Sequence, residues 1–241
     1  EARQIAEAIP TSINPIRRFQ LLAELYDRVG DAPRAFAAFE EMNAASLAAK
    51  PSPPGPTYRE KTEKRAAQIN PEAIHAWRPL ELEPLPAPPV FIVGFPRSGT
   101  TLLDTLLMNI PSLHVMEELP AFQHVEAAFD EARLGDLTTD EARALRERYL
   151  EAVRQLSPPG PGPEQRIVDK HPLHMARMPS IHRLFPEGKI ILVERHPCDA
   201  VLSCFMSNFT LNHAMRSFVD LEEAARTYDV VFEAWTRSEK L

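Results

Sequence analysis

Residues 90–101 read VFIVGFPRSGTT, and this stretch indicates the fold of the larger part of the chain. Its first four residues are apolar and mostly β-branched, which is typical of a strand buried on both faces of a parallel sheet. A glycine turn follows, and helical spacing of apolar residues begins at Thr100. The same order of strand, turn and helix returns at 189–208, and 166–169 is a further strand candidate. The alternation predicts an α/β fold with a P-loop-type parallel sheet flanked by helices.

The turn from Gly94 to Thr101 has the composition of an anion-binding loop. Its two glycines are five residues apart, a spacing that lets backbone N–H groups surround an anion at the start of a helix. The loop departs from the Walker A pattern, because Thr100 stands where that pattern has lysine and Arg97 supplies the cation instead. A P-loop nucleotide kinase is therefore the less favoured alternative, and a glycine turn that only ends the strand is another.

A short all-α segment precedes this domain. Residues 14–46 hold two helical patterns separated by Gly30, and their spacing resembles one tetratricopeptide repeat. An ordinary helical hairpin is the alternative. Proline-rich stretches at 51–56 and 79–89 bracket a short helical stretch and predict a stiff connector. The expected divisions are a helical-repeat segment at 1–50, a connector with one helix at 51–87 and the α/β domain at 88–241.

The composition argues against several classes of function. The chain has 241 residues, of which 44% are hydrophobic and 25% charged, and its formal net charge is −7. This acidic balance disfavours a broad electrostatic contact with nucleic acid or acidic lipid. No stretch has the length and apolarity of a membrane span, and two cysteines are too few for a disulfide framework. We expect a protein of a reducing compartment, the cytoplasm, whose oligomeric state these patterns do not predict.

Three motifs, in order, resemble those of the sulfotransferases, which take a sulfuryl group from 3′-phosphoadenosine 5′-phosphosulfate (PAPS). Residues 96–101, PRSGTT, are similar to the 5′-phosphosulfate loop of tyrosylprotein sulfotransferases. A helical segment followed by such a domain resembles the tetratricopeptide-repeat sulfotransferases. The resemblance covers about residues 88–241. The residues that it assigns to the 5′-phosphosulfate are Arg97, Ser98, Gly99, Thr100 and Thr101.

The second motif, residues 195–203, implies a site for the 3′-phosphate of PAPS. The resemblance assigns this phosphate to Arg195 and Ser203. The assignment suits the chemistry, because the arginine side chain offers a fixed fork of donors and the serine hydroxyl adds one more. The alternative is that Arg195 only pairs with a nearby carboxylate.

The third motif gives the candidate catalytic residues. In tyrosylprotein sulfotransferases a Glu-Glu pair follows the loop helix, so the resemblance implies that Glu118 takes the acceptor proton, with Glu117 as an orienting partner. It also implies that Lys170 touches the transferring sulfuryl group, where it and Arg97 stabilise charge. No metal is expected. Another possible base is His171 or His114, since cytosolic sulfotransferases use a histidine.

Two departures from the family pattern leave the acceptor open. Pro120 stands where tyrosylprotein sulfotransferases have a basic residue that helps to build the acceptor site. We therefore expect only that the acceptor group is a hydroxyl or an amine. A protein or peptide is one candidate for the molecule that bears it. The family also continues beyond the helical stretch 221–238 with a further strand and a basic loop, so we expect the domain to be C-terminally incomplete. A non-catalytic helical-repeat interaction protein with a degenerate nucleotide site is the alternative from another class.

Overall fold

The computed structural model describes residues 2–10, 12–52, 54–162 and 164–239. Contacts within the chain divide it into two compact units. One unit comprises Glu1–Lys61 and His196–Val230, and the other comprises Thr62–Arg195 and Val231–Leu241. Residues 196–230 thus pack with the N-terminal helices, and the module boundaries expected from the sequence stay predictions.

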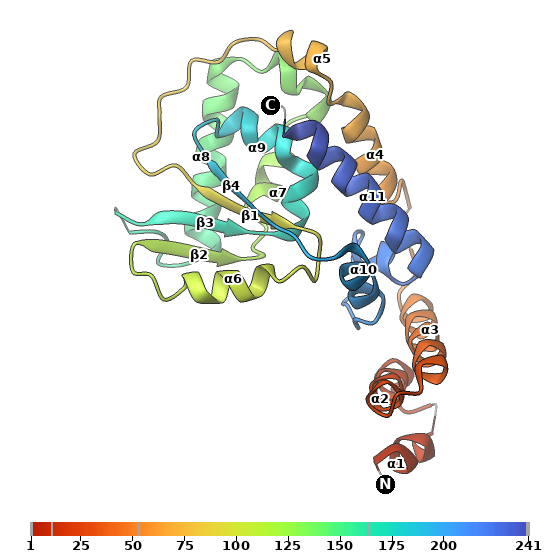
Figure 1. Cartoon of the computed structure of the whole chain (residues 1–241). Coiled ribbons are helices and arrows are strands. Elements are labelled where there is room, and N and C mark those ends of the chain that lie inside the picture. The colour runs from red at the N-terminus through yellow and green to blue at the C-terminus, as the bar shows by residue number, and fades with distance from the viewer. Residues whose placement is uncertain (1, 11, 53, 163, 240–241) are drawn as a thin grey trace. The chain divides into compact units, whose positions relative to one another are not determined.

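A parallel sheet of four strands forms the centre of the second unit (Figure 1). The strands are β1 (Val90–Gly94), β2 (Leu113–Glu117), β3 (Arg166–Lys170) and β4 (Lys189–Val193). Their order in the sheet is β2-β3-β1-β4, and each neighbouring pair is parallel. The apolar run expected to be a buried strand is β1, which lies inside the sheet, whereas the edge strand β4 is more exposed. The predicted α/β fold with a parallel sheet is confirmed.

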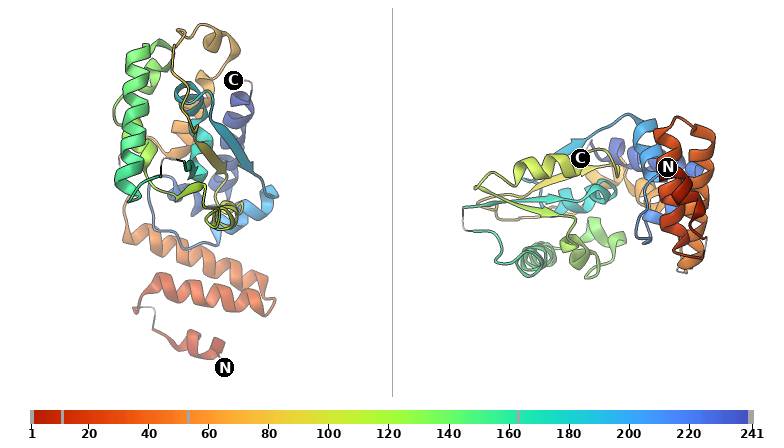
Figure 2. Two further views of the ribbon diagram at one scale, coloured as in Figure 1. Left: turned by 90° about the vertical axis from the view of Figure 1, so that its left-hand side faces the viewer. Right: turned by 90° about the horizontal axis from the view of Figure 1, so that it is seen from below.

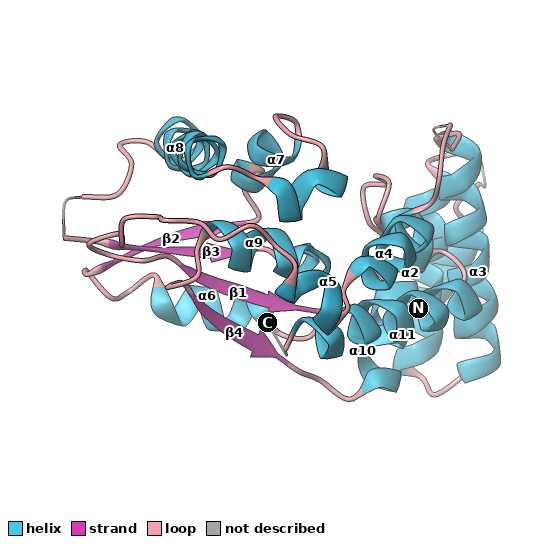
Figure 3. Ribbon diagram, turned by 90° about the horizontal axis from the view of Figure 1, so that it is seen from above, coloured by secondary structure: helices cyan, strands magenta, loops and turns pink. Residues whose placement is uncertain are grey.

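Helices cover both faces of this sheet (Figure 2 and Figure 3). The helix α6 lies on one face, and α7, α8 and α9 lie on the other. The bounds are Thr100–Leu107 for α6, Ala121–Glu126 for α7, Thr139–Leu156 for α8 and Met178–Leu184 for α9, with 3-10 turns at Glu131–Asp136 (η1) and Pro172–Arg177 (η2). Buried aromatic rings fill the space under α8 and α9. Tyr149 packs edge-on against Phe185 with ring centroids 5.0 Å apart, and Phe91 of β1 lies 5.7 Å from Phe185.

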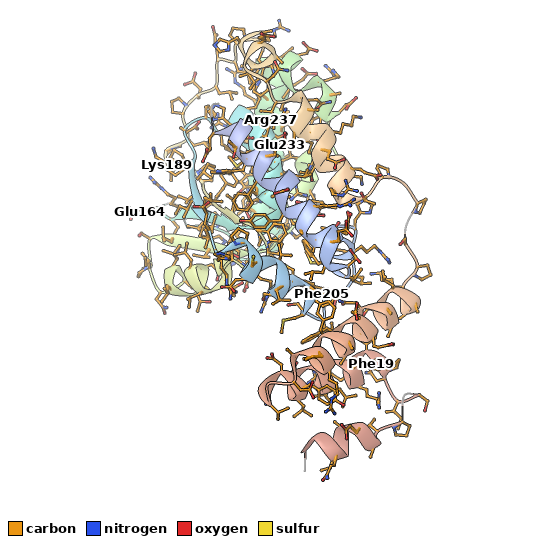
Figure 4. The ribbon with its side chains drawn as sticks, turned by 45° about the vertical axis from the view of Figure 1, so that its right-hand side comes forward. Phe19, Glu164, Lys189, Phe205, Glu233 and Arg237 are labelled. Atoms are coloured by element: carbon orange, nitrogen blue, oxygen red, sulfur yellow. The ribbon has the colours of Figure 1, made fainter. Side chains whose placement is uncertain are left out.

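The helical unit contains the expected helical hairpin. Its elements are α1 (Ala2–Ala8), α2 (Pro15–Arg28), α3 (Ala32–Ala49), α10 (Pro197–Phe205) and η3 (Met215–Phe218). Gly30 adopts φ 77° just after α2, and Asp31 caps α3 by accepting a hydrogen bond from the N–H of Arg34. Phe205 stacks on Phe36 at 5.2 Å between ring centroids and belongs to the hairpin's apolar core (Figure 4). The structure thus has two packed helices, α2 and α3, where the sequence predicts a hairpin, and the relation of this segment to tetratricopeptide repeats stays a prediction.

Three further helices lie within the described ranges. They are α4 (Tyr58–Gln68), α5 (Pro71–His75) and α11 (Leu221–Ser238). Near its end, α11 carries the ion pair of Arg237 with Glu233 at 2.6 Å, and Arg237 also donates to the carbonyl of Ala66 in α4 (Figure 4). Among the helices that the structure describes, none combines the length and the apolarity needed to cross a membrane.

Candidate active site

The loop between β1 and α6 has the backbone shape of an anion site. Gly94 ends β1, where an added Cβ would lie 2.6 Å from the carbonyl oxygen of Val193, so only glycine allows this approach of β1 to β4. Arg97 and Gly99 both have left-handed backbones, with φ of 69° and 102°. Mixed right- and left-handed residues point successive N–H groups into a concavity that binds anions. The left-handed conformation of a non-glycine residue costs about 1–3 kcal/mol and is typical of functional loops.

The side chains of this loop divide into buried hydroxyls and exposed groups. Ser98 and Thr100 are buried, with 7% and 3% of their surface exposed, whereas Arg97 and Thr101 are exposed. The first N–H groups of α6 have no acceptor inside the helix and face the loop end. The predicted phosphosulfate residues therefore lie together on one loop and the first turn of one helix.

The structure also brings Arg195 to this loop. Its Nη1 donates a hydrogen bond of 3.1 Å to the carbonyl oxygen of Arg97. The parallel pairing of β1 with β4 explains this contact, because the carboxyl ends of both strands lie at the same edge of the sheet. Ser203 lies on α10 in the other unit, so its predicted pairing with Arg195 stays a prediction.

Lys170, the last residue of β3, is the centre of a charged cluster at this edge. Its Nζ lies 2.9 Å from Oε1 of Glu118, 3.3 Å from Oε1 of Glu117 and 3.1 Å from Oδ2 of Asp104. The hydroxyl of Thr101, at 3.2 Å, is the fourth neighbour. The cluster joins the end of β2, the end of β3 and the first turns of α6.

The members of this Lys170 cluster differ sharply in burial. The side chains of Lys170 and Asp104 are 0% exposed, whereas those of Glu117 and Glu118 are 47% and 52% exposed. Burial by itself lowers the pKa of Lys170, but the neighbouring carboxylates of Glu118 and Asp104 outweigh it and raise the pKa above its ordinary value. Lys170 is therefore a charged ammonium across the physiological range.

The backbone fixes the position of Glu118 as well. Glu118 follows β2 directly, has φ of 51°, and its N–H donates to the carbonyl oxygen of Lys170 at 2.8 Å. A left-handed glutamate is unusual and turns the chain out of the sheet at this point. The structure thus brings the predicted base and the predicted stabilising lysine into direct contact.

A second buried network lies behind Lys170, and the sequence motifs do not predict it. Asp169 is 0% exposed and its Oδ2 accepts a hydrogen bond of 3.0 Å from the hydroxyl of Tyr149. The Nε2 atom of His174 is 3.2 Å from the same oxygen. Burial and the charge of Asp169 raise the pKa of Tyr149 well above 10.0, so the phenol stays protonated. The network anchors β3 to α8 and η2 next to Lys170.

The two alternative bases fit the geometry less well than Glu118. His171 stacks on His174 with centroids 4.8 Å apart; burial, and then the charges of His174, Arg177 and Lys170, lower its pKa to about 2. A group that resists protonation so strongly is a weak proton acceptor at neutral pH. His114 is the second residue of β2, about 13 Å from Glu118 along an extended strand.

His171 and His174 are three residues apart, a spacing seen in metal sites, but their surroundings do not favour a metal ion. Both ring nitrogens of His174 already have polar neighbours, Asp169 at one side and the Arg177 guanidinium at the other. Within the described ranges, no group of three or more His, Cys, Asp or Glu side chains could hold a metal ion.

Asp104 belongs to the Lys170 cluster, but no sequence motif predicts it. It lies one helical turn after Thr100 and so faces the same side of α6, a spacing that marks it as a candidate. The sequence does not show that β3 lies across from it.

The sheet, the loop after β1 and the Lys170 cluster define an α/β protein with a candidate active site at the carboxyl ends of its strands. A model of the sulfotransferase family matches residues 88–240, and the chain belongs to this family. The match covers the sheet, the loop after β1 and the Lys170 cluster.

Relatives with curated sequences are each similar to about half of the chain. An uncharacterized protein of Aquifex aeolicus (strain VF5) is 31% identical over 143 residues, which is 54% of this chain and 18% of that protein. Protein-tyrosine sulfotransferase 1 of Homo sapiens is 28% identical over 137 residues, which is 52% of this chain and 35% of the human protein. The matched segment thus spans well under half the length of each relative.

Proposed function

We propose that this chain transfers a sulfuryl group from PAPS to an acceptor hydroxyl or amine, and that Glu118 and Lys170 carry the transfer. The observation that carries the proposal is the contact of Lys170 with both Glu118 and Thr101. It joins a carboxylate, a cation and the anion-binding loop within one hydrogen-bonded group. Acid–base transfer of an anionic group needs these three elements close together.

The donor is proposed to lie along the loop and the adjacent strand end. The N–H groups around Gly99 and the hydroxyls of Ser98, Thr100 and Thr101 would hold its 5′-phosphosulfate, with Arg97 as the cation. Arg195, which already contacts the loop, would bind the 3′-phosphate together with Ser203. The donor set fits the group, because N–H and hydroxyl donors and two guanidinium groups suit phosphate and sulfate oxygens.

Glu118 would take the proton of the acceptor as the acceptor atom forms its bond to sulfur. In the same step the bond from sulfur to the bridging phosphate oxygen breaks, and 3′-phosphoadenosine 5′-phosphate (PAP) leaves with that electron pair. Lys170 and Arg97 would stabilise the negative charge on the sulfuryl and phosphate oxygens. None of these roles requires a metal ion.

The acceptor is proposed to be a protein or peptide, and two observations bear on it. The human relative is named a protein-tyrosine sulfotransferase, and its matched segment includes half of this chain. The hairpin of α2 and α3 offers a helical surface of the kind that repeat proteins use to bind partners.

Isothermal titration of PAP, of ATP and of ATP with Mg²⁺ tests the donor site. Arg195→Ala should weaken PAP binding at least about tenfold, since a charged phosphate contact is worth roughly 1.5–3 kcal/mol. Arg143→Ala is the matched control, because this arginine pairs with Asp140 on the surface of α8. Preference for ATP with Mg²⁺ would favour a nucleotide kinase, and absence of nucleotide binding by the folded chain would favour an interaction protein.

A further inference from the structure

The neighbours of Lys170 outnumber its hydrogen-bond donors. An ammonium has three N–H groups, whereas Nζ has four oxygen neighbours within 3.3 Å, from Thr101, Asp104, Glu117 and Glu118. The side chain is also 0% exposed. A sulfuryl oxygen can therefore reach the ammonium only if one of these oxygens leaves.

Burial decides which oxygens can leave. The carboxylates of Glu117 and Glu118 are about half exposed, so water can solvate them away from Lys170. Asp104 is 0% exposed, and its Oδ2 has no well-aligned hydrogen bond from the described part of the chain, so the ammonium at 3.1 Å is its main compensation. A buried carboxylate without that cation is strongly disfavoured.

We infer that Asp104 is a positioning residue, which keeps the Lys170 ammonium in place when the sulfuryl donor displaces Glu118 and Glu117. The exchange has a chemical benefit, because it releases the proposed base toward the acceptor only after the donor has arrived. Asp104 sits on α6, whose first turn forms part of the anion loop, so the same helix holds both the donor and the lysine. The inference rests on the proposed function.

The groups around Lys170 determine how its titration should respond. The charged or titratable groups facing it are Asp104 from α6, Glu117 and Glu118 from β2, and His171, the next residue in the chain. The charge of Asp104 raises the pKa of Lys170, so its removal should lower that pKa. The basic limb of the pH–rate profile should then move to lower pH.

The test compares Asp104→Asn and Asp104→Glu with Asp140→Asn in the full chain. Asp140 is a matched control, because it also pairs with a cation, Arg143, but its side chain is 93% exposed. The readouts are PAP affinity by titration calorimetry, the Lys170 titration by NMR of ¹³Cε-labelled lysine, and kcat and KM for PAPS with whichever acceptor the unaltered chain sulfates. The Lys170 signal is assigned from its absence in Lys170→Arg.

Asp104→Asn should lower kcat about 10- to 100-fold by misplacing the lysine, leave PAP affinity within about threefold and shift the Lys170 titration to lower pH. In Asp104→Glu the pKa of Lys170 should stay near its value in the unaltered chain, because the carboxylate is retained. This variant replaces Asp104→Asn in the test if the asparagine variant does not fold. If the Asp104→Asn variant folds and binds PAP, but its kcat and its Lys170 titration are unchanged, the inference about Asp104 is wrong. The proposed function is not affected by that result. Absence of PAP binding by the unaltered chain would overturn the proposed function, and the inference with it.

Discussion

The ammonium of Lys170 lies 2.9 Å from the carboxylate of Glu118, and the N–H of Glu118 donates to the carbonyl oxygen of Lys170 at 2.8 Å. The two residues are thus joined through side chain and backbone across neighbouring parallel strands. Under the proposed function this contact holds both groups inactive, since the lysine stabilises the carboxylate of the proposed base and that carboxylate occupies the lysine. Donor binding can separate them, because an anionic sulfuryl group competes for the same ammonium.

Glu118→Gln should lower the rate of sulfuryl transfer about 10²- to 10⁴-fold, the usual contribution of a general base. The amide has nearly the same shape but cannot accept the acceptor proton. PAP affinity should stay within about threefold, because Glu118 is not assigned to the nucleotide. Glu117→Gln is the matched control, and an equal loss of rate in both variants would contradict the assignment of the base.

Lys170→Met should destabilise the fold by about 3–5 kcal/mol, because it leaves the buried carboxylate of Asp104 without a cation. Adding Asp104→Asn should recover much of that loss, since the buried charge is then gone. Urea unfolding measures both variants. Lys189→Met, at an exposed position of the edge strand, is the control and should change stability little. A double variant no more stable than the single one would show that the pair is not coupled.

His171→Asn should make the fold less sensitive to acid. The pKa of His171 falls from 6.5 to about 2 on folding, so the unfolded chain binds the extra proton below pH 6.5 and acid favours unfolding. Below pH 6.5 the free energy of unfolding of the unaltered chain should therefore fall more steeply than that of the variant. The difference between the two slopes should be up to about 1.4 kcal/mol per pH unit. Asparagine retains an acceptor for the N–H of Leu173, which His171 now caps. Urea unfolding at several pH values measures the two slopes, and equal slopes would contradict the lowered pKa.

A tyrosine peptide with aspartate neighbours should be a poorer acceptor than the same peptide with glycine neighbours, by about two- to fivefold. The Lys170 cluster has one ammonium and three carboxylates, and the side chain of Glu117 is about half exposed. An acidic peptide should therefore be repelled by this cluster. Comparison of kcat/KM for the two peptides measures the effect. Glu117→Gln and raised salt should both narrow the difference, because the repulsion is electrostatic and exposed. A preference for the acidic peptide would contradict this prediction.

Local sequence was sufficient for the elements that carry the site. The apolar run at β1, the glycines of the loop and the proximity of Glu118 and Lys170 to strand ends can each be recognised over a few residues. The reason is physical: strand burial, turn conformation and helix starts depend on neighbouring side chains and backbone angles. The parallel sheet then follows from the alternation of strands and helices.

Tertiary structure alone decided which charges meet at Lys170. Asp104, Glu118 and Lys170 come from separate segments, and their contact depends on β3 lying between β2 and β1 with α6 packed on one face. Strand order and the depth of burial are set by packing of the whole unit, which no local pattern encodes. The same holds for Tyr149 and His174, which converge on Asp169 from α8 and η2. The sequence thus determined the elements and their chemistry, while packing determined which carboxylate is buried against the lysine and which can leave it.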